Sequence, residues 1–360
     1  MGRVLRNLNR NFCNFGFVGD DDSMTFNDVL EIKNGKNQKA VENPKGTYPI
    51  YGSGGVMGYA DEYICKADTI VIGRKGSINN PIYVDEPFWN VDTAFGLEAK
   101  EDVLKPHYLY YFCKKFDFER LNKAVTIPSL TKSDLLKIEI NLPDLDEQQG
   151  IIDKLMKIEK IIQYRKDELS SLDELIKARF VEMFGDPVLN DKKFSTLSGE
   201  DFFKLSNGKA VPEEKRHEVG IPAYGGNGIS WYTNEVLRVE DTLVVGRVGF
   251  QSGNVHYAVG PLWITDNAMY ISQYDKGKIN LVFLCELMQR VNFSRFQDAG
   301  DLKKITQKPF MSFQYILPSM ELQQKFVDFK EQVDKSKSAI EKELKKTQLL
   351  FDSLMQKYFG

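Results

Sequence analysis

The chain contains few of the residue patterns on which enzymes and metalloproteins depend. Its 360 residues include only three histidines, His107, His217 and His256, and none stands in an H-E-x-x-H or comparable metal-ligand spacing. No G-x-x-x-x-G-K-[ST] phosphate loop is present. The Gly-rich residues 51–55 lack the strand-loop-helix context of a dinucleotide site, so we interpret them as a turn. Residues 79–82 resemble an amino-methyltransferase loop but lack its Pro-Pro-aromatic sequence. The sequence therefore predicts no catalytic centre.

Cysteines and long apolar runs are also scarce. The four cysteines, Cys13, Cys65, Cys113 and Cys285, include no C-x-x-C pair, which predicts reduced, buried thiols rather than disulfides or a metal site. No apolar run approaches the ~20 residues of a membrane span, and the N-terminus lacks the apolar core of a signal peptide. We therefore expect a cytoplasmic protein. A net charge of −3 does not indicate a nucleic-acid binder, but such binding depends on local basic patches.

What the chain does contain is an internal repeat. Residues 48–52 return as residues 221–225, and residues 73–76 return as residues 246–249, both at a shift of 173 positions. The shift becomes 174 for Trp89 and Trp263, and 175 for the Leu-Pro pairs at 142–143 and 317–318. Two copies, each far longer than a solenoid unit, indicate a pseudo-dimer within one chain rather than an array. Such a molecule can hold two similar surfaces.

The first part of each copy has the pattern of a β-rich mixed domain. Strand-like runs such as residues 69–72 and 81–84 are interrupted by Gly and Asn turns, and a helix is expected over residues 106–121. In the second copy, residues 242–245 form the matching strand and residues 279–291 the matching helix.

Each copy ends in a long helical stretch with apolar residues alternately four and three positions apart. The first seam is Ile151, Leu155, Ile158, Ile162, Arg165, Leu169, Leu172, Ile176, Arg179 and Met183, and the second is Phe326, Lys330, Val333, Lys337, Ile340, Leu344, Thr347, Phe351, Leu354 and Tyr358. This spacing is typical of a coiled coil. Helices of ~36–40 residues span roughly 55–60 Å, and we expect the two to pack antiparallel. The alternative is two long surface helices without a shared seam.

Polar and basic turn residues recur at matching places in both copies. Arg, Asn and Gln make bidentate contacts with base edges in the major groove, and Lys and hydroxyl side chains suit phosphate contacts. The candidate DNA-binding residues are Lys36, Arg74, Lys75, Ser77, Asn79, Asn80 and Lys132 in the first copy and Lys209, Arg247, Gln251, Ser252, Asn254, Lys303 and Lys304 in the second. Any one of these residues alone is more often part of a solvated surface turn than of a binding site. A shared scaffold with different side chains at its tips is what two domains need if they bind two different DNA sequences.

Four motifs give the chain a resemblance to a known family. They are IVIGRKGS at residues 70–77, IPSLTKSDL at 127–135, INLP at 140–143 followed by EQQ at 147–149, and LDELIKARFVEMFGDP at 172–187. On these, residues 24–360 resemble the specificity subunits of type I restriction-modification enzymes. One departure is that the second copy has Lys303 where the first has Pro128.

The resemblance implies an α+β fold in which two β-rich mixed target recognition domains stand in tandem repeat, separated by two long antiparallel coiled-coil helices. The expected segments are an N-terminal extension over 1–23 without assignment, a first recognition domain over 24–143, a spacer helix over 144–184, a second recognition domain over 185–318 and a second spacer helix over 319–360.

The resemblance also implies a function without catalysis in this chain. Each recognition domain would read one half of a bipartite, asymmetric site in double-stranded DNA, and the helices would set the spacing and dock two modification subunits that methylate adenine. Restriction subunits would add translocation and cleavage. S-adenosylmethionine, ATP and Mg would be bound by these partners and not by this chain. Two alternatives stay open: a stand-alone sequence-specific DNA-binding protein, and an enzyme in its own right.

Overall fold

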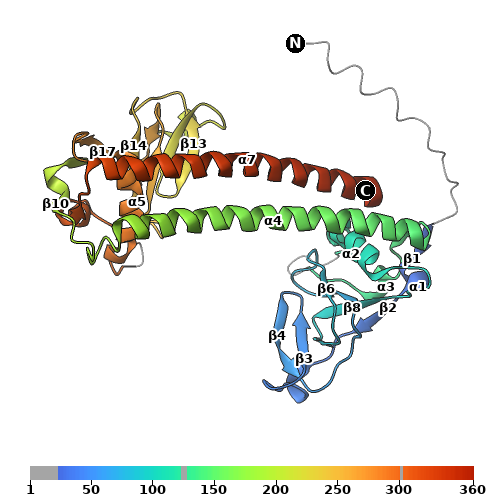
Figure 1. The fold of residues 1–360 in the computed structure, drawn as a ribbon. Coiled ribbons are helices and arrows are strands. Elements are labelled where there is room, and N and C mark those ends of the chain that lie inside the picture. The colour runs from blue at the N-terminus through green and yellow to red at the C-terminus, as the bar shows by residue number, and fades with distance from the viewer. Residues whose placement is uncertain (1–22, 123–127, 301–302) are drawn as a thin grey trace, which may run out of the picture. The chain divides into compact units, whose positions relative to one another are not determined.

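The structure is a computed structural model that describes residues 23–122, 128–300 and 303–360 (Figure 1). The extension over 1–23, except for the backbone of Ser23, therefore lies outside the described residues, as does Cys13. The chain divides into two compact units. The first combines the residues up to Arg165 with Glu343–Gly360, and the second is Lys166–Lys342. These units differ from the expected linear segments, because each long helix is divided between them.

The first unit contains a domain of short strands covered by helices. Its elements before the long helix are β1 Ser23–Thr25, α1 Phe26–Val29, β2 Leu30–Asn34, η1 Gln38–Ala40, β3 Tyr48–Gly52, β4 Gly55–Ala60, β5 Thr69–Gly73, β6 Ile82–Val84, β7 Trp89–Asn90, β8 Ala94–Ala99, α2 Pro106–Lys115, η2 Phe118–Leu121, α3 Lys132–Leu135 and β9 Glu139–Asn141. They form sheets of order β2-β8-β5-β6, β4-β3-β7 and β1-β9. Every residue of the central strand β5 is buried, as expected for its run of β-branched residues.

The second unit repeats this domain element by element. Its elements are β10 Thr196–Ser198, η3 Gly199–Asp201, β11 Phe203–Asn207, η4 Glu213–Lys215, β12 Ile221–Gly225, β13 Gly228–Thr233, β14 Thr242–Gly246, β15 Val255–Ala258, β16 Trp263–Ile264, β17 Ala268–Tyr274, α5 Leu281–Val291, η5 Phe293–Phe296, α6 Lys308–Ser312 and β18 Gln314–Ile316. The sheets have the corresponding orders β11-β17-β14-β15, β13-β12-β16 and β10-β18. The repeat in the sequence is therefore a repeat of topology.

Two of the expected helices are shorter than the sequence pattern indicated. The helix expected over 106–121 ends at Lys115, because Phe116 is extended and Asp117 caps the separate 3₁₀ helix η2 by accepting from the Glu119 N–H. The helix expected from residue 279 begins at Leu281, because the Asn280 side chain caps its first turn. The Gly-rich residues 51–55 form the expected turn, between β3 and β4.

The two long helices are α4, Leu145–Phe184, and α7, Met320–Phe359, each of 40 residues. All twenty expected seam positions are buried or half-buried, which confirms the seam. In the first unit the beginning of α4 packs with the end of α7, where Leu155 and Ile162 share a core with Phe351. In the second unit the end of α4 packs with the beginning of α7, where Ile176 and Phe326 share a core. Within each unit the pair is antiparallel.

Three polar residues of the seam, Arg165, Lys330 and Lys337, have partners in the seam or next to it. Arg165 donates to the side chain of Thr347 and to the Glu343 carbonyl. Lys337 pairs with Asp173, and the Lys330 ammonium lies 2.7 Å from a carboxylate oxygen of Asp334. The contacts of Arg165 and Lys337 join α4 to α7 and so favour the observed alignment of the helices within each unit, whereas Lys330 and Asp334 lie on the same helix.

Candidate nucleic-acid interface

The loop after β5 is held by a second segment of the first domain. The Arg74 N–H donates to the Thr93 carbonyl at 2.8 Å, and the Arg74 carbonyl accepts from the Leu130 N–H at 2.9 Å. The Gly76 N–H donates to the Pro128 carbonyl at 3.1 Å. This network fixes the backbone of the loop while the side chains of Arg74, Lys75 and Ser77 stay exposed.

The second domain reproduces this network with different side chains. The Arg247 N–H donates to the Asn267 carbonyl at 2.9 Å, the Ile305 N–H donates to the Arg247 carbonyl at 3.0 Å, and the Gly249 N–H donates to the Lys303 carbonyl at 2.8 Å. Only backbone groups take part, so the replacement of Pro128 by Lys303 leaves the frame unchanged. The structure thus brings Arg247 and Lys304 onto adjacent segments, linked by a bridge between Val248 and Lys304.

Lys36 and Lys209 occupy matching turns after β2 and β11. The indole N–H of Trp89 donates to the Lys36 carbonyl at 3.1 Å, and that of Trp263 donates to the Lys209 carbonyl at 2.8 Å. A Cβ on the preceding glycine, Gly35, would lie 1.7 Å from the Val91 carbonyl oxygen, so the turn requires glycine there. Both lysine side chains are exposed.

The exposed arginines differ in how they are held. The Arg74 guanidinium lies over the ring of Phe95, 5.6 Å from its centroid, which orients the group without using its hydrogen-bond donors. Arg247 makes a long hydrogen bond of 3.3 Å to the Asp266 carbonyl. Both therefore keep donors available for a ligand.

Several candidate residues serve the domain itself. The amide of Asn79 accepts from the Phe118 N–H at 2.7 Å and donates to Asp117 at 3.0 Å, which ties the loop to η2. The Lys132 ammonium donates to the Ile32 carbonyl at 2.8 Å. Ser252 is fully buried, so we remove it from the candidate set because a ligand at the surface cannot reach its hydroxyl.

Gln251 and Asn254 are linked to each other, since the Asn254 amide donates to the Gln251 side chain. Asn80 is exposed at the end of its loop, and Lys303 is half-buried beside Lys304. Each loop offers an exposed arginine, Arg74 or Arg247, with an exposed lysine beside it, Lys75 in the first domain and Lys304 in the second.

The sequence analysis missed Phe250, which lies in the second loop with 87% of its surface exposed. The sequence did contain a sign of this extra residue, because the shift between the two copies changes from 173 to 174 positions between Gly249 and Trp263. That change marks an inserted residue in or near this loop.

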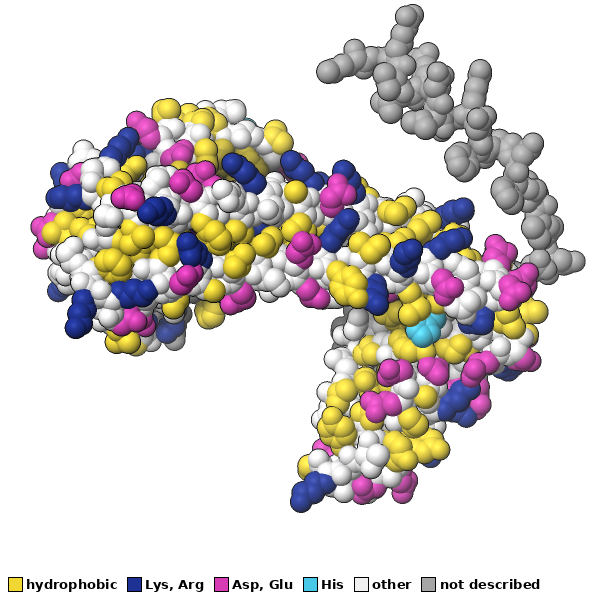
Figure 2. Space-filling model, in the orientation of Figure 1, with side chains coloured by type: hydrophobic (Ala, Val, Ile, Leu, Met, Phe, Trp, Pro, Cys, Tyr) yellow, Lys and Arg dark blue, Asp and Glu magenta, His cyan; other side chains and the backbone are white. Residues whose placement is uncertain are grey.

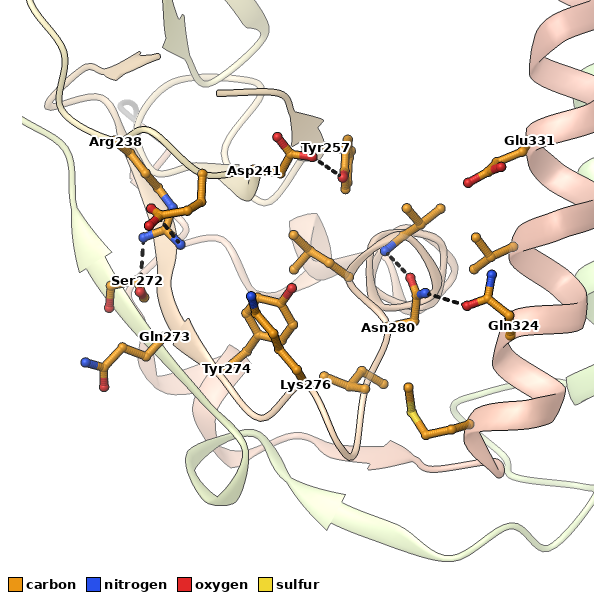
Figure 3. Close-up of a pocket in the computed structure, with 16 residues that line it drawn as sticks. Arg238, Asp241, Tyr257, Ser272, Gln273, Tyr274, Lys276, Asn280, Gln324 and Glu331 are labelled. Atoms are coloured by element: carbon orange, nitrogen blue, oxygen red, sulfur yellow. Dashed lines mark hydrogen bonds and ion pairs between the residues drawn. The ribbon is translucent and has the colours of Figure 1, made fainter. Parts of the chain in front are cut away.

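Away from the loops, the second unit has a polar cavity of about 900 Å³ where its domain meets α7 (Figure 3). In it the Tyr257 hydroxyl donates to Asp241 at 2.6 Å, and the Asn280 amide donates to Gln324 at 3.3 Å. Burial, together with the Asp241 acceptor, raises the pKa of Tyr257, so this hydroxyl stays protonated. A smaller cavity of about 320 Å³ occupies the matching place in the first unit and includes Gln149.

The described residues contain no group of three His, Cys, Asp or Glu side chains placed to hold a metal ion. Cys65, Cys113 and Cys285 are free and buried, which confirms the predicted burial of these three side chains. Burial raises the pKa of Cys65 and of Cys285 to about 12, so both thiols stay protonated near neutral pH. No helix in the described ranges has the length and hydrophobicity needed to cross a membrane.

Charge is mixed rather than segregated on the face drawn in Figure 2. Lys and Arg side chains there alternate with Asp and Glu side chains over both units. This agrees with the net charge of −3, and nucleic-acid contact through this face would depend on local groups of basic side chains.

Comparison with known proteins assigns the family. The type I restriction modification DNA specificity domain matches residues 20–173 and again residues 191–349. A Methanocaldococcus jannaschii protein bearing the name of the MjaX type I restriction enzyme specificity subunit is 24% identical over 69% of this chain and 68% of its own length. A type I specificity subunit of Mycoplasma pneumoniae is 27% identical over 39% of this chain, a match that spans about half of that relative.

The fold is similar to that of a solved structure as well. The type I restriction-modification S subunit from M. genitalium superposes with a TM-score of 0.68 at 20% identity, over 95% of this chain and 98% of that one. The described fold, with mixed helix and sheet domains in tandem and long helices, agrees with this likeness. The chain therefore belongs to the type I restriction-modification DNA specificity family and carries two of its specificity domains in tandem.

Proposed function

We propose that this chain is the recognition subunit of a type I complex and that each domain reads one half of a bipartite, asymmetric DNA site. The observation that carries the proposal is the backbone frame that both loops share. The same hydrogen bonds hold Arg74 and Arg247, whereas the neighbouring side chains change from Lys75 to Val248 and from Ser129 to Lys304. A constant frame with variable side chains suits two domains that bind two different base sequences in the same way.

Within this proposal, Arg74 and Arg247 contact base edges, and the lysines contact phosphates. An arginine can donate two parallel hydrogen bonds to guanine, whereas an ammonium acts as a point charge and positions the protein without reading sequence. The exposed lysines on these loops and turns are Lys36, Lys75, Lys209 and Lys304.

The long helices would set the separation between the half-sites. α4 and α7 each continue without interruption through both compact units, and a helix of 40 residues is about 60 Å long. Paired charges such as Lys337 with Asp173 hold one register of the seam, which a spacer of fixed length requires.

The partners would be two modification subunits, with restriction subunits added for cleavage. The cavities beside Gln149 and Gln324 are matching surfaces, one in each unit, where a domain meets the start of its long helix. Two copies of one partner could use them. S-adenosylmethionine, ATP and Mg would then be bound by those partners, and this chain would supply recognition alone.

The test is to sequence methylated adenines in the native host with and without this gene. Loss of one bipartite methylated motif in the deletion strain is expected. The purified chain alone should transfer no methyl group to a duplex that carries that motif. Methyl transfer by the isolated chain, or no change in the methylated motifs, would refute the proposal. If the chain binds DNA and a pull-down from the native host recovers no modification or restriction subunit with it, the result would favour a stand-alone DNA-binding protein.

A further inference from the structure

Phe250 is the extra residue by which the second recognition loop differs in length from the first. Asp68 pairs with Tyr83, 15 positions later, and Asp241 pairs with Tyr257, 16 positions later. The insertion therefore lies inside the loop that these pairs enclose.

Close contacts locate the insertion to one residue. A Cβ on Gly73 would lie 2.2 Å from the Ser77 carbonyl oxygen, and a Cβ on Gly246 would lie 2.5 Å from that of Gln251. Gly73 and Gly246 are 173 positions apart, whereas Ser77 and Gln251 are 174 apart. Since Gly76 and Gly249 are still 173 apart and make matching hydrogen bonds, the added residue is Phe250.

The structure holds this phenylalanine outward on a fixed backbone. The amide of Gln297 donates to the Phe250 carbonyl at 3.3 Å and to that of Ser252. The Ser252 N–H donates to the Gly249 carbonyl at 3.0 Å. Positive φ angles at Gly249 and Gly253, +90° and +94°, turn the chain on either side. The ring has no role in the core, since 87% of the residue is exposed.

The surroundings of Phe250 favour nucleic acid over protein as its partner. Arg247 and Lys304 are exposed on the same loop system, and the exposed Arg295 lies two residues before Gln297. Asp298 also lies here, with its N–H bonded to the Lys304 carbonyl. An apolar ring among cationic side chains suits a groove where phosphates flank base edges, because an apolar side chain can contact the thymine 5-methyl group.

We propose that Phe250 is a specificity-determining residue of the second domain, and that its ring contacts a thymine methyl group in the major groove of one half-site. This rests on the proposed function. The first domain lacks the residue, so only one of the two half-sites would depend on such a contact.

The experiment uses the complex of the full chain with its modification subunits and a duplex carrying the methylated motif. Target and random duplexes are titrated against wild type, Phe250→Ala and the control Val239→Ala, which alters another exposed apolar residue of the same unit (70% exposed). Phe250→Ala should weaken target binding roughly tenfold, which is the loss expected when an apolar side chain of this size stays in water. It should leave random-duplex binding unchanged, and Val239→Ala should bind as wild type.

Deoxyuridine placed at each thymine in turn then removes single methyl groups. Wild type should lose about fourfold in affinity at one position in one half-site, and Phe250→Ala should be insensitive there. Unchanged target binding by Phe250→Ala overturns the inference, as does equal loss on both duplexes or sensitivity to deoxyuridine that persists in the variant. Loss of a modification subunit by Phe250→Ala, seen by native mass spectrometry with DNA affinity intact, overturns it in favour of a protein contact. Failure of wild type to distinguish the duplexes refutes the proposed function instead.

Discussion

Gln148 and Gln323 make the same three hydrogen bonds at the start of the two long helices. The Gln148 side chain donates to the Val103 and Pro143 carbonyls and accepts from the Lys105 N–H. Gln323 donates to Lys278 and Pro318 and accepts from the Asn280 N–H at 2.8 Å. Both side chains are fully buried. They join each domain to the helix that follows it and are not partner contacts themselves.

Removing either glutamine should destabilise its unit. Gln323→Ala leaves one buried N–H and two carbonyls without their partner, so we expect the free energy of unfolding to fall by about 2–3 kcal/mol. Urea unfolding measures the change. The matched control is Gln324→Ala, which alters an exposed neighbour whose hydrogen bonds to Asp328 and to the Asn280 side chain are open to solvent, so its stability should stay within about 0.5 kcal/mol of wild type. Equal effects of the two substitutions would contradict the structural role of Gln323.

Arg74→Ala and Arg247→Ala should each weaken specific DNA binding by about 1–3 kcal/mol if the guanidinium makes a bidentate base contact. Titration of target and random duplexes measures the loss, and Lys346→Ala on an exposed part of α7 is the control. Neither arginine supports the fold through its side chain beyond the Phe95 and Asp266 contacts. An equal loss on both duplexes would show that the arginine contacts only phosphate.

The helices are tested by changing their length. Four residues inserted near Arg165 lengthen α4 by roughly 6 Å and also break the seam, so the preferred half-site spacing should change or disappear. Seven residues inserted after Arg165, with seven more before Glu343, keep the heptad pattern and add about 10 Å. The recognised half-sites should then lie about three base pairs farther apart, at about 3.4 Å each. Mapping the methylated adenines measures the distance between the two half-sites. An unchanged spacing in an active complex would exclude the helices as the spacer.

Two modification subunits should bind each chain, because the domain–helix junction that offers a cavity beside Gln149 recurs beside Gln324. Native mass spectrometry of the complex counts them. Met156→Arg and Glu331→Arg alter matching cavity positions, one in each unit, and each should remove one subunit. A maximum of one modification subunit in the wild-type complex would refute the two-site arrangement.

Because its thiols are buried, we expect the free energy of unfolding of this chain to fall at alkaline pH. Burial raises the pKa of Cys65 in the folded chain from 9.0 to about 12. The folded state therefore keeps this proton where the unfolded state releases it, so the contribution of Cys65 to stability should be constant below about pH 9 and should fall as the pH rises above it. At pH 8, Cys65, Cys113 and Cys285 should resist iodoacetamide until urea unfolds the chain, as peptide mass spectrometry can show. Labelling of Cys65 in the native chain would contradict its burial.

The parts of the fold that depend on periodicity were predictable, and the parts that depend on contacts across the domain were not. The seam was visible because apolar residues such as Ile162 and Phe351 recur at fixed intervals. The end of α2 was not predictable, because it depends on contacts that the local sequence does not show. Asp117 caps η2, and the side chain of Asn79, from a loop distant in sequence, accepts from the Phe118 N–H.

The candidate site was predictable only in part for the same reason. Repetition identified the loops of Arg74 and Arg247, but sequence does not say which polar side chains turn inward. Lys132 donates to a carbonyl of β2, and Ser252 is buried under its own loop. Phe250 escaped notice because an inserted residue has no counterpart with which to be compared.

The end of α7 belongs to the first unit, and this has a consequence for the order of folding during synthesis. Phe359 packs on Tyr108 with ring centroids 4.9 Å apart, and Phe351 and Met355 lie in the same core. The domain that precedes α4 therefore completes its core only after α7 has been synthesised, whereas the domain that follows α4 packs on a helix already made. Of the two domains, the one synthesised earlier is therefore completed later.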